Sequence, residues 1–239
     1  RNFGKRRNSD RTLTIKICVS VPPQTVTEAL DLIKKAENQN ADFIEVRLDS
    51  LKKHNQLADI AHCSNTPLIA TNRSTECQGK FLGSETERQK ILMDAAKNGF
   101  EYVDIELSTP KLKNFTRDLR EIGAKPIVSF HDFNKTPNST QLNKILKKEI
   151  ASGADVCKIV TTARFVEDNL TVLDFVSKVC KTARIVCFSM GELGKPSRLL
   201  SPVFGAFFTL ASLESGRKTA PGQLTVQEMR STYAALGLK

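Results

Sequence analysis

Residues 155–161, Asp-Val-Cys-Lys-Ile-Val-Thr, read as a buried β-strand that carries a lysine at its centre. Because strand side chains alternate between two faces, Val156, Lys158 and Val160 share one face and the intervening residues share the other. No acidic residue follows Lys158 within the strand, and burial of an unpaired ammonium lowers its pKa. We therefore expect a neutral, nucleophilic amine at this position. The alternative is a lysine at a strand end that extends its charge into water, and the rest of the chain decides between the two.

The segments on either side of this strand follow one alternating pattern. Short runs rich in apolar and β-branched residues predict strands at residues 14–20, 41–49, 66–71, 101–107, 125–131, 155–161, 184–190 and 203–210. Helical spacing of apolar residues predicts helices at residues 25–38, 56–63, 84–98, 110–122, 139–152, 166–181 and 225–236, with a short helical turn near 196–200. Ser84 and Glu87 form a capping-box pattern at the start of the third helix.

Eight successive strand–helix units indicate the α/β class and predict a single-domain (β/α)8 TIM barrel over residues 13–239. The runner-up is an open, doubly wound sheet. Such a sheet is expected to carry a glycine-rich sequence after its first strand, whereas this chain has Val21, Pro22 and Pro23 there.

Composition indicates a globular protein without a membrane span. Of the 239 residues, 40% are hydrophobic and 26% are charged, and the longest apolar runs are far too short to cross a bilayer. The six cysteines include no Cys-X-X-Cys pair, and several lie in apolar runs, where a free cysteine behaves as a small hydrophobic residue. We therefore expect a cytoplasmic protein with reduced thiols.

The net charge is +10, and part of it is concentrated at the amino terminus, where residues 1–11 hold five basic residues against one acidic residue. Residues 1–12 are therefore expected to form a basic, flexible arm. A nucleic-acid-binding module built on this arm is one alternative function. Such modules interleave aromatic residues with a basic surface, whereas here the other lysines are scattered over helix-like segments and the chain has no Trp. We expect no nucleic-acid partner.

Polar and ionisable residues gather at the predicted carboxyl ends of the strands, which is where (β/α)8 barrels place their active sites. In chain order they are Glu45, Arg47, Asp49, Arg73, Asp104, Glu106, Ser129, His131 and Lys158, with Arg198 in the loop after the seventh strand. Singly, each has a structural explanation, such as an ion pair between two neighbours on one strand. A barrel interior is packed and largely apolar, so inward ionisable groups on five successive strands favour one shared pocket.

These residue types fit Schiff-base chemistry. A desolvated lysine attacks a ketone and forms an iminium, which withdraws electrons from the neighbouring carbon. A histidine such as His131 takes a proton from that carbon and protonates a leaving group, while a carboxylate such as Glu106 orients the imidazole. Arginines and side-chain amides bind carboxylates and hydroxyls. The residues therefore predict a reaction on a hydroxylated keto acid.

Seven sequence motifs occur in a specific order around the Lys158 strand. They are IKICVS (15–20), IEVRLD (44–49), TNRS (71–74), VDIEL (103–107), SFHDF (129–133), SMGELGKPSRL (189–199) and APGQLTV (220–226). In this ordered set the chain resembles the type I 3-dehydroquinate dehydratases of the shikimate pathway. The resemblance implies a homodimeric lyase that converts 3-dehydroquinate to 3-dehydroshikimate through a lysine Schiff base, with no metal or other cofactor. A route toward chorismate and the aromatic amino acids and a catabolic route fit the same residues.

The resemblance also implies a role for each matching residue. Lys158 stands at the Schiff-base position and His131 at the position of the general acid and base, beside the acidic pair Asp104 and Glu106. The substrate-binding positions are Glu45, Arg47, Arg73, Asp104, Met190, Arg198, Thr219 and Gln223. Among these, Arg198 and Gln223 match the groups that hold the substrate carboxylate.

Two departures from the family pattern concern the loops around the pocket. After Arg73, relatives carry an EGG-like lid sequence, whereas this chain has Glu76-Cys77-Gln78-Gly79, so either Glu76 or Gln78 takes the polar role of the lid. Thr219 stands where many relatives have serine, and its hydroxyl preserves the expected contact with the carboxylate. A class I aldolase or transaldolase is the alternative enzyme, because it shares the barrel and the lysine.

Overall fold

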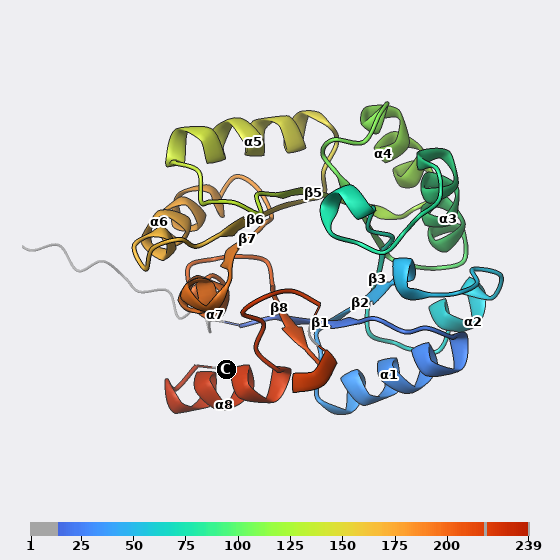
Figure 1. Ribbon diagram of the computed structural model, residues 1–239, viewed down its shortest axis with the longest axis horizontal. Coiled ribbons are helices and arrows are strands. Elements are labelled where there is room, and N and C mark those ends of the chain that lie inside the picture. Colours follow the sequence, from blue (N-terminus) through green and yellow to red (C-terminus); the bar gives the residue numbers. More distant parts are fainter. Residues whose placement is uncertain (1–13, 218, 239) are drawn as a thin grey trace, which may run out of the picture.

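The computed structural model describes residues 14–217 and 219–238. Within these residues eight parallel strands form one sheet, in the order β7-β6-β5-β4-β3-β2-β1-β8, that curls into a nearly closed barrel (Figure 1). The strands are β1 (Ile17–Val21), β2 (Phe43–Arg47), β3 (Leu68–Thr71), β4 (Tyr102–Glu106), β5 (Lys125–His131), β6 (Val156–Thr162), β7 (Ile185–Met190) and β8 (Thr209–Ser212). The basic arm expected at residues 1–12 lies outside the described residues.

An α-helix follows each strand and packs on the outside of the barrel (Figure 1). The helices are α1 (Val26–Asn38), α2 (Leu57–Ala61), α3 (Glu85–Lys97), α4 (Leu112–Glu121), α5 (Ser139–Ala151), α6 (Asp168–Val179), α7 (Lys195–Leu200) and α8 (Val226–Ala235). The predicted (β/α)8 barrel is therefore confirmed. The predicted capping box also forms, since Ser84 and Glu87 each accept a hydrogen bond from the other's backbone N–H at the start of α3. Among the described helices, none has the length and hydrophobicity needed to cross a bilayer.

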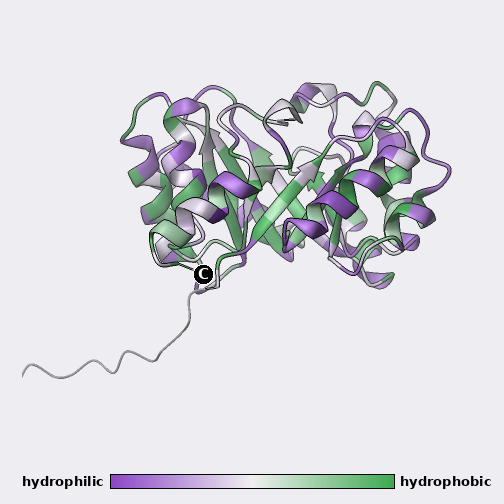
Figure 2. Cartoon of the chain, turned by 90° about the horizontal axis from the view of Figure 1, so that it is seen from below, coloured by the Kyte–Doolittle hydropathy of each residue, from purple (hydrophilic) through white to green (hydrophobic). Residues whose placement is uncertain are grey.

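Alternate side chains of β6 point into and out of the barrel, as predicted. Val156 and Val160 belong to the apolar cluster inside the barrel, whereas Cys157 and Ile159 pack outward against residues of α5 and α6. Figure 2 shows the same division on a larger scale, with mainly hydrophobic strands at the centre and hydrophilic segments on the surrounding helices. Lys158 shares the inward face and therefore lies inside the barrel.

The eighth strand differs from the prediction, which placed it at residues 203–210. Residues 201–205 form consecutive turns instead, in which Gly205 adopts a left-handed φ of +104° that favours glycine. Of the apolar residues that suggested a strand, Phe207 and Phe208 pack inside the barrel from a loop, and Phe208 lies against Phe43 with ring centroids 5.1 Å apart. Strand β8 therefore begins several residues later than its hydrophobicity indicates.

Candidate active site

Most of the predicted site residues line one cavity at the carboxyl ends of the strands. Those in its wall are Glu45, Arg47, Arg73, His131, Lys158, Met190, Arg198, Thr219 and Gln223. The two carboxylates of β4 lie outside the wall but contact residues within it. Asp104 binds both Arg73 and Lys158, and Glu106 binds Arg73.

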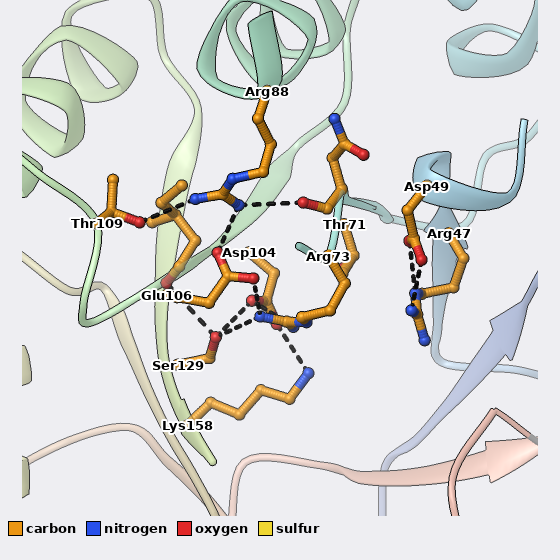
Figure 3. Close-up of polar contacts among 12 residues, drawn as sticks. Arg47, Asp49, Thr71, Arg73, Arg88, Asp104, Glu106, Thr109, Ser129 and Lys158 are labelled. Atoms are coloured by element: carbon orange, nitrogen blue, oxygen red, sulfur yellow. Dashed lines mark hydrogen bonds and ion pairs between the residues drawn. The ribbon is translucent and has the colours of Figure 1, made fainter. Parts of the chain in front are cut away.

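Lys158 is buried, but its ammonium is paired with carboxylates from other strands (Figure 3). Its Nζ lies 2.7 Å from Asp104 Oδ2 and 3.3 Å from Glu45 Oε1. Burial alone would lower the pKa of Lys158, but these two carboxylates raise it above its ordinary value. The expectation of a neutral amine is therefore wrong for this structure, in which Lys158 is an ammonium at neutral pH.

Asp104 is the carboxylate around which the cationic groups are arranged. Its Oδ1 accepts hydrogen bonds from Arg73 Nη2 and Ser129 Oγ, both at 2.7 Å, and Ser129 in turn accepts one from Arg73 Nη1 at 2.9 Å. Burial would raise the pKa of Asp104, but Arg73 and Lys158 hold it well below its usual range. Asp104 is consequently ionised at every physiological pH.

Glu45 on β2 is held by hydroxyl groups from the strands on either side of it. Its carboxylate accepts hydrogen bonds from Ser20 Oγ at 2.5 Å and Thr71 Oγ1 at 3.0 Å, besides the contact with Lys158. Although burial opposes ionisation, Lys158 and Arg47 lower the pKa of Glu45. Sequence reasoning did not single out Ser20 or Thr71, whose inward positions follow from the strand register.

His131, at the end of β5, stacks on Phe133 with ring centroids 5.7 Å apart and planes 8° from parallel. Burial and the positive charges of Arg73 and Lys158 hold the pKa of His131 well below its ordinary value, against the opposite effect of Asp104. The imidazole is therefore neutral at pH 7 and is able to accept a proton. Within the described residues its Nδ1 has no hydrogen-bond partner.

Glu106, expected to orient His131, instead binds two arginines. Its Oε1 lies 3.0 Å from Arg73 Nη1 and its Oε2 lies 2.5 Å from Arg88 Nη1. Arg88 on α3 is 2% exposed and was not anticipated, because it lies in a polar helical segment that reads as a solvent-exposed surface. Figure 3 shows Arg88 reaching from α3 toward Glu106.

Arg198 on α7 is a buried cation whose contacts within the protein are weak. Its Nη1 and Nη2 donate to the carbonyl oxygens of Leu210 and Pro221, both at 3.4 Å, and its guanidinium lies 4.2 Å from the ring centre of Phe188. In the described residues Nε has no hydrogen-bond partner and no carboxylate pairs with the guanidinium. Burial lowers the pKa of Arg198 to about 9, so the side chain remains charged at neutral pH. Such a site favours an anionic ligand.

Gln223 and Thr219, from the loop after β8, complete this side of the cavity. Gln223 is 1% exposed, and its Oε1 accepts hydrogen bonds from Thr219 N at 2.8 Å and Thr219 Oγ1 at 3.3 Å. Thr219 Oγ1 also lies 3.2 Å from Ser20 Oγ, which joins the loop to β1. Because the carbonyl end of the amide is held in this way, its NH2 group is suited to donate to a ligand.

Arg47 and Asp49 form an ion pair at the edge of the site, at some distance from the network around Lys158 in Figure 3. Arg47 donates to both carboxylate oxygens of Asp49, at 2.8 and 2.7 Å. Asp49 was expected on the strand face shared with Glu45 and Arg47, but β2 ends at Arg47 and Asp49 lies in the following 3-10 turn. There it accepts a hydrogen bond from the backbone N–H of Lys80 at 3.0 Å and so ties down the loop that follows Arg73.

That loop contributes Cys77 and Gln78 to the cavity wall. Gln78 adopts a left-handed φ of +58°. Glu76 lies instead in a separate groove beside Arg88 and Glu106. Of the two candidates for the lid's polar role, Gln78 is thus the one that faces the cavity. The described residues contain no group of three or more His, Cys, Asp or Glu side chains able to hold a metal ion.

Comparison with known proteins identifies the family. Residues 17–239 match the type I 3-dehydroquinase family. The chain is 38% identical to a 3-dehydroquinate dehydratase of Dehalococcoides mccartyi over 206 residues, which cover 86% of this chain and 90% of that protein. It is 35% identical to a 3-dehydroquinate dehydratase of Methanocaldococcus jannaschii over 227 residues, which cover 93% of this chain and 100% of that protein.

Solved structures agree with this match. A type I 3-dehydroquinate dehydratase from Clostridium difficile, with covalently modified comenic acid, has a TM-score of 0.82 and 25% identity, covering 93% of this chain and 92% of that chain. The 3-dehydroquinate dehydratase from Aquifex aeolicus has a TM-score of 0.77 and 29% identity, covering 92% of this chain and 98% of that chain. The chain belongs to the type I 3-dehydroquinase family, and its activity is the dehydration of 3-dehydroquinate.

Proposed function

We propose that this dehydration proceeds through a Schiff base between Lys158 and the ketone of 3-dehydroquinate. The observation that carries the proposal is the position of Lys158 Nζ, buried in the wall of a cavity that also contains His131 and Arg198. A lysine, a neutral imidazole and a guanidinium with no carboxylate partner in the described residues match the three parts of the substrate that must be recognised. These parts are the ketone, the neighbouring C–H bond and the carboxylate.

The proposed reaction begins when the Lys158 ammonium gives up one proton and the resulting amine adds to the ketone carbon. The former ketone oxygen takes up that proton and leaves as water, which produces a protonated iminium. His131 then takes a proton from the carbon next to the iminium and returns it to the hydroxyl that departs as water. Hydrolysis of the conjugated iminium consumes one water and releases 3-dehydroshikimate and Lys158. Net conversion is therefore loss of one water from the substrate, and both side chains end as they began.

The ammonium form of Lys158 sets a requirement for this mechanism. A protonated amine is not nucleophilic, so Lys158 has to lose a proton before it attacks. The contacts with Asp104 and Glu45 are what raise its pKa. If the side chain leaves these carboxylates to approach the ketone, its pKa falls toward the value that burial favours, and the neutral amine forms where it is needed.

We assign the substrate carboxylate to Arg198, with Gln223 and Thr219 as further donors. The buried guanidinium has room for a bidentate partner, since its present hydrogen bonds are 3.4 Å long. Glu45, Arg47, Arg73 and Asp104 are the candidates for binding the ring hydroxyls and ordering the site, and Met190 packs against the ring. Glu106 acts in the site through its ion pair with Arg73.

Covalent modification in a relative supports the Schiff-base proposal. The Clostridium difficile enzyme described above was solved with covalently modified comenic acid. The family match argues against the alternative of a class I aldolase or transaldolase, which would cleave a carbon–carbon bond.

We also propose that the enzyme is a cytoplasmic homodimer. All six cysteines are free thiols, which supports a reducing compartment. The family resemblance supports the dimer. Light scattering on the purified protein tests it, with an expected mass near twice the 26.5 kDa of one chain, whereas a mass near 26.5 kDa contradicts it.

The proposed role of Lys158 is tested by turnover of 3-dehydroquinate, followed through the absorbance of the conjugated enone product. Lys158→Met is expected to abolish turnover, because it removes the amine while preserving much of the side-chain volume. Lys178→Met is the matched control, since Lys178 is 68% exposed on α6 and pairs with Asp174. Turnover by Lys158→Met at a rate close to that of the control would contradict the mechanism.

A further inference from the structure

Arg88 is the most completely bonded buried cation in the described residues, yet it lies outside the wall of the active-site cavity. Its five N–H groups make five hydrogen bonds. Nε and Nη2 donate to the carboxylate of Glu85 at 2.7 and 2.9 Å, and Nη2 also donates to Thr109 Oγ1 at 3.0 Å. Nη1 donates to the carbonyl oxygen of Asn72 at 3.0 Å and to Glu106 at 2.5 Å. Because every N–H donor of the Arg88 guanidinium has an acceptor, these contacts form a specific binding arrangement rather than an incidental one.

The partners of Arg88 lie next to residues of the active site. Asn72 directly precedes Arg73, and Glu106 is the carboxylate that shares an ion pair with Arg73. Arg88 therefore fixes the backbone that leads into Arg73 and also one of the two carboxylates that hold the Arg73 side chain. The other carboxylate is Asp104, which binds Lys158 as well.

These contacts form a continuous series in which positive and negative groups alternate, and Figure 3 shows its central part from Arg88 to Lys158. The series is Glu85, Arg88, Glu106, Arg73, Asp104, Lys158 and Glu45. Each carboxylate between two cations is shared, so a change at one end alters how tightly the next group is held. Because Arg88 takes part of the charge of Glu106, Arg73 relies more on Asp104, and Asp104 is less available to Lys158.

We propose that Arg88 is a positioning residue for the dehydration, which acts on Lys158 through Glu106, Arg73 and Asp104. This inference rests on the proposed Schiff-base role of Lys158. Arg88 itself touches neither the cavity nor the substrate. Its function is to keep Glu106 partly neutralised, so that the ammonium of Lys158 is held firmly enough to stay in place but can still lose its proton.

The proposal predicts that two substitutions have opposite effects on how tightly Asp104 holds the Lys158 ammonium. In Arg88→Gln, Glu106 binds Arg73 more strongly, and Asp104 is freed to hold the Lys158 ammonium. In Glu106→Gln, Arg73 relies on Asp104 alone, and the ammonium is held less. The charged and titratable groups that face Lys158 are Asp104, Glu45, Arg73, His131 and the thiol of Cys18, and neither substitution replaces any of them.

The measured quantity is the rate of Schiff-base formation as a function of pH, from samples quenched with borohydride at successive times. In Arg88→Gln the acidic limb of this profile is expected to move to higher pH by about half a unit or more, and in Glu106→Gln it is expected to move to lower pH. On the acidic limb Arg88→Gln should therefore lower kcat by about threefold or more, the factor to which half a pH unit corresponds, while KM changes by less than about threefold because the cavity wall is intact. Arg88→Lys keeps the charge and should restore the position of the wild-type limb.

Arg230→Gln serves as the control, because Arg230 bonds to Asp42 and the Asn40 carbonyl, residues next to the amino-terminal end of β2. It is expected to leave the pH profile unchanged. If Arg88 were only a structural clamp, Arg88→Gln would lower the thermal midpoint and leave the acidic limb in place, which would overturn the proposal. If either Arg88→Gln or Glu106→Gln does not fold, the direction in which the acidic limb moves in the other variant tests the proposal. Absence of an adduct in the wild-type enzyme would instead refute the Schiff-base mechanism.

Discussion

Replacement of Arg198 by methionine is expected to weaken substrate binding strongly without destabilising the empty enzyme. The guanidinium is 1% exposed and has no anionic partner in the described residues, and its two hydrogen bonds to carbonyl oxygens are 3.4 Å long. Removing it therefore costs the folded, empty protein little and relieves the burial of a charge. The bound substrate, in contrast, loses the partner of its carboxylate.

The size of the effect follows from this burial. Truncating one partner of a buried, hydrogen-bonded charge pair costs roughly 2–5 kcal/mol, which corresponds to a rise in KM of about 30-fold to several thousand-fold. Arg198→Lys should fall between methionine and wild type, because lysine keeps the charge but loses the planar fork and most of the stacking on Phe188. Gln223→Ala removes one neutral donor and should raise KM by about tenfold or less.

Two measurements on each variant separate binding from folding. Initial rates with 3-dehydroquinate give KM and kcat, and a thermal melt without substrate gives the midpoint. Arg184→Met is the matched control, since its guanidinium also lies over an aromatic ring, 5.5 Å from the centre of Phe207, but directly before β7 at the opposite end of the strand. A wild-type KM in Arg198→Met would refute the carboxylate assignment, and a much lower melting midpoint would show that Arg198 is a structural residue.

Two further results are expected. His131→Ala should still form the adduct with substrate while kcat falls by about 10²- to 10⁴-fold, as mass spectrometry and initial rates would show, whereas near-wild-type turnover would assign His131 a structural role. Glu149 on α5 is fully buried, and burial raises its pKa well above its ordinary value, so the folded state retains a proton that the unfolded state releases as pH rises above about 4.5. The free energy of unfolding of the wild type should therefore fall by about 1.4 kcal/mol per pH unit from this group, until the pH reaches the folded pKa. Glu149→Gln should remove this slope in denaturant titrations between pH 5 and 8, and parallel pH dependences for variant and wild type would contradict the assignment.

The sequence was sufficient for the barrel and for the position of the lysine. Alternation in residues 155–161 placed Lys158 inside, and the repeated strand–helix pattern predicted eight units. The eighth strand was misplaced because Phe207 and Phe208 reach the barrel interior from a loop, and hydrophobicity does not distinguish a buried loop from a buried strand.

The charge state of the site could not be read from the sequence, because it depends on contacts between distant segments. The carboxylates that keep Lys158 protonated are 54 and 113 residues away from it along the chain. For the same reason Arg88 was missed and Glu106 was paired with His131 rather than with two arginines. Polar residues in a predicted helix are expected to be exposed to solvent, and only the folded structure shows which of them are buried against other segments.

The central claim is that Lys158 forms a Schiff base with the substrate, and chemical trapping tests it most directly. The enzyme would be mixed with 3-dehydroquinate, reduced with borohydride, and analysed by intact-mass and peptide mass spectrometry. We expect one covalent adduct per chain, located on Lys158, together with loss of activity that depends on both substrate and borohydride. An adduct on another residue, or full activity with no adduct after this treatment, would contradict the mechanism.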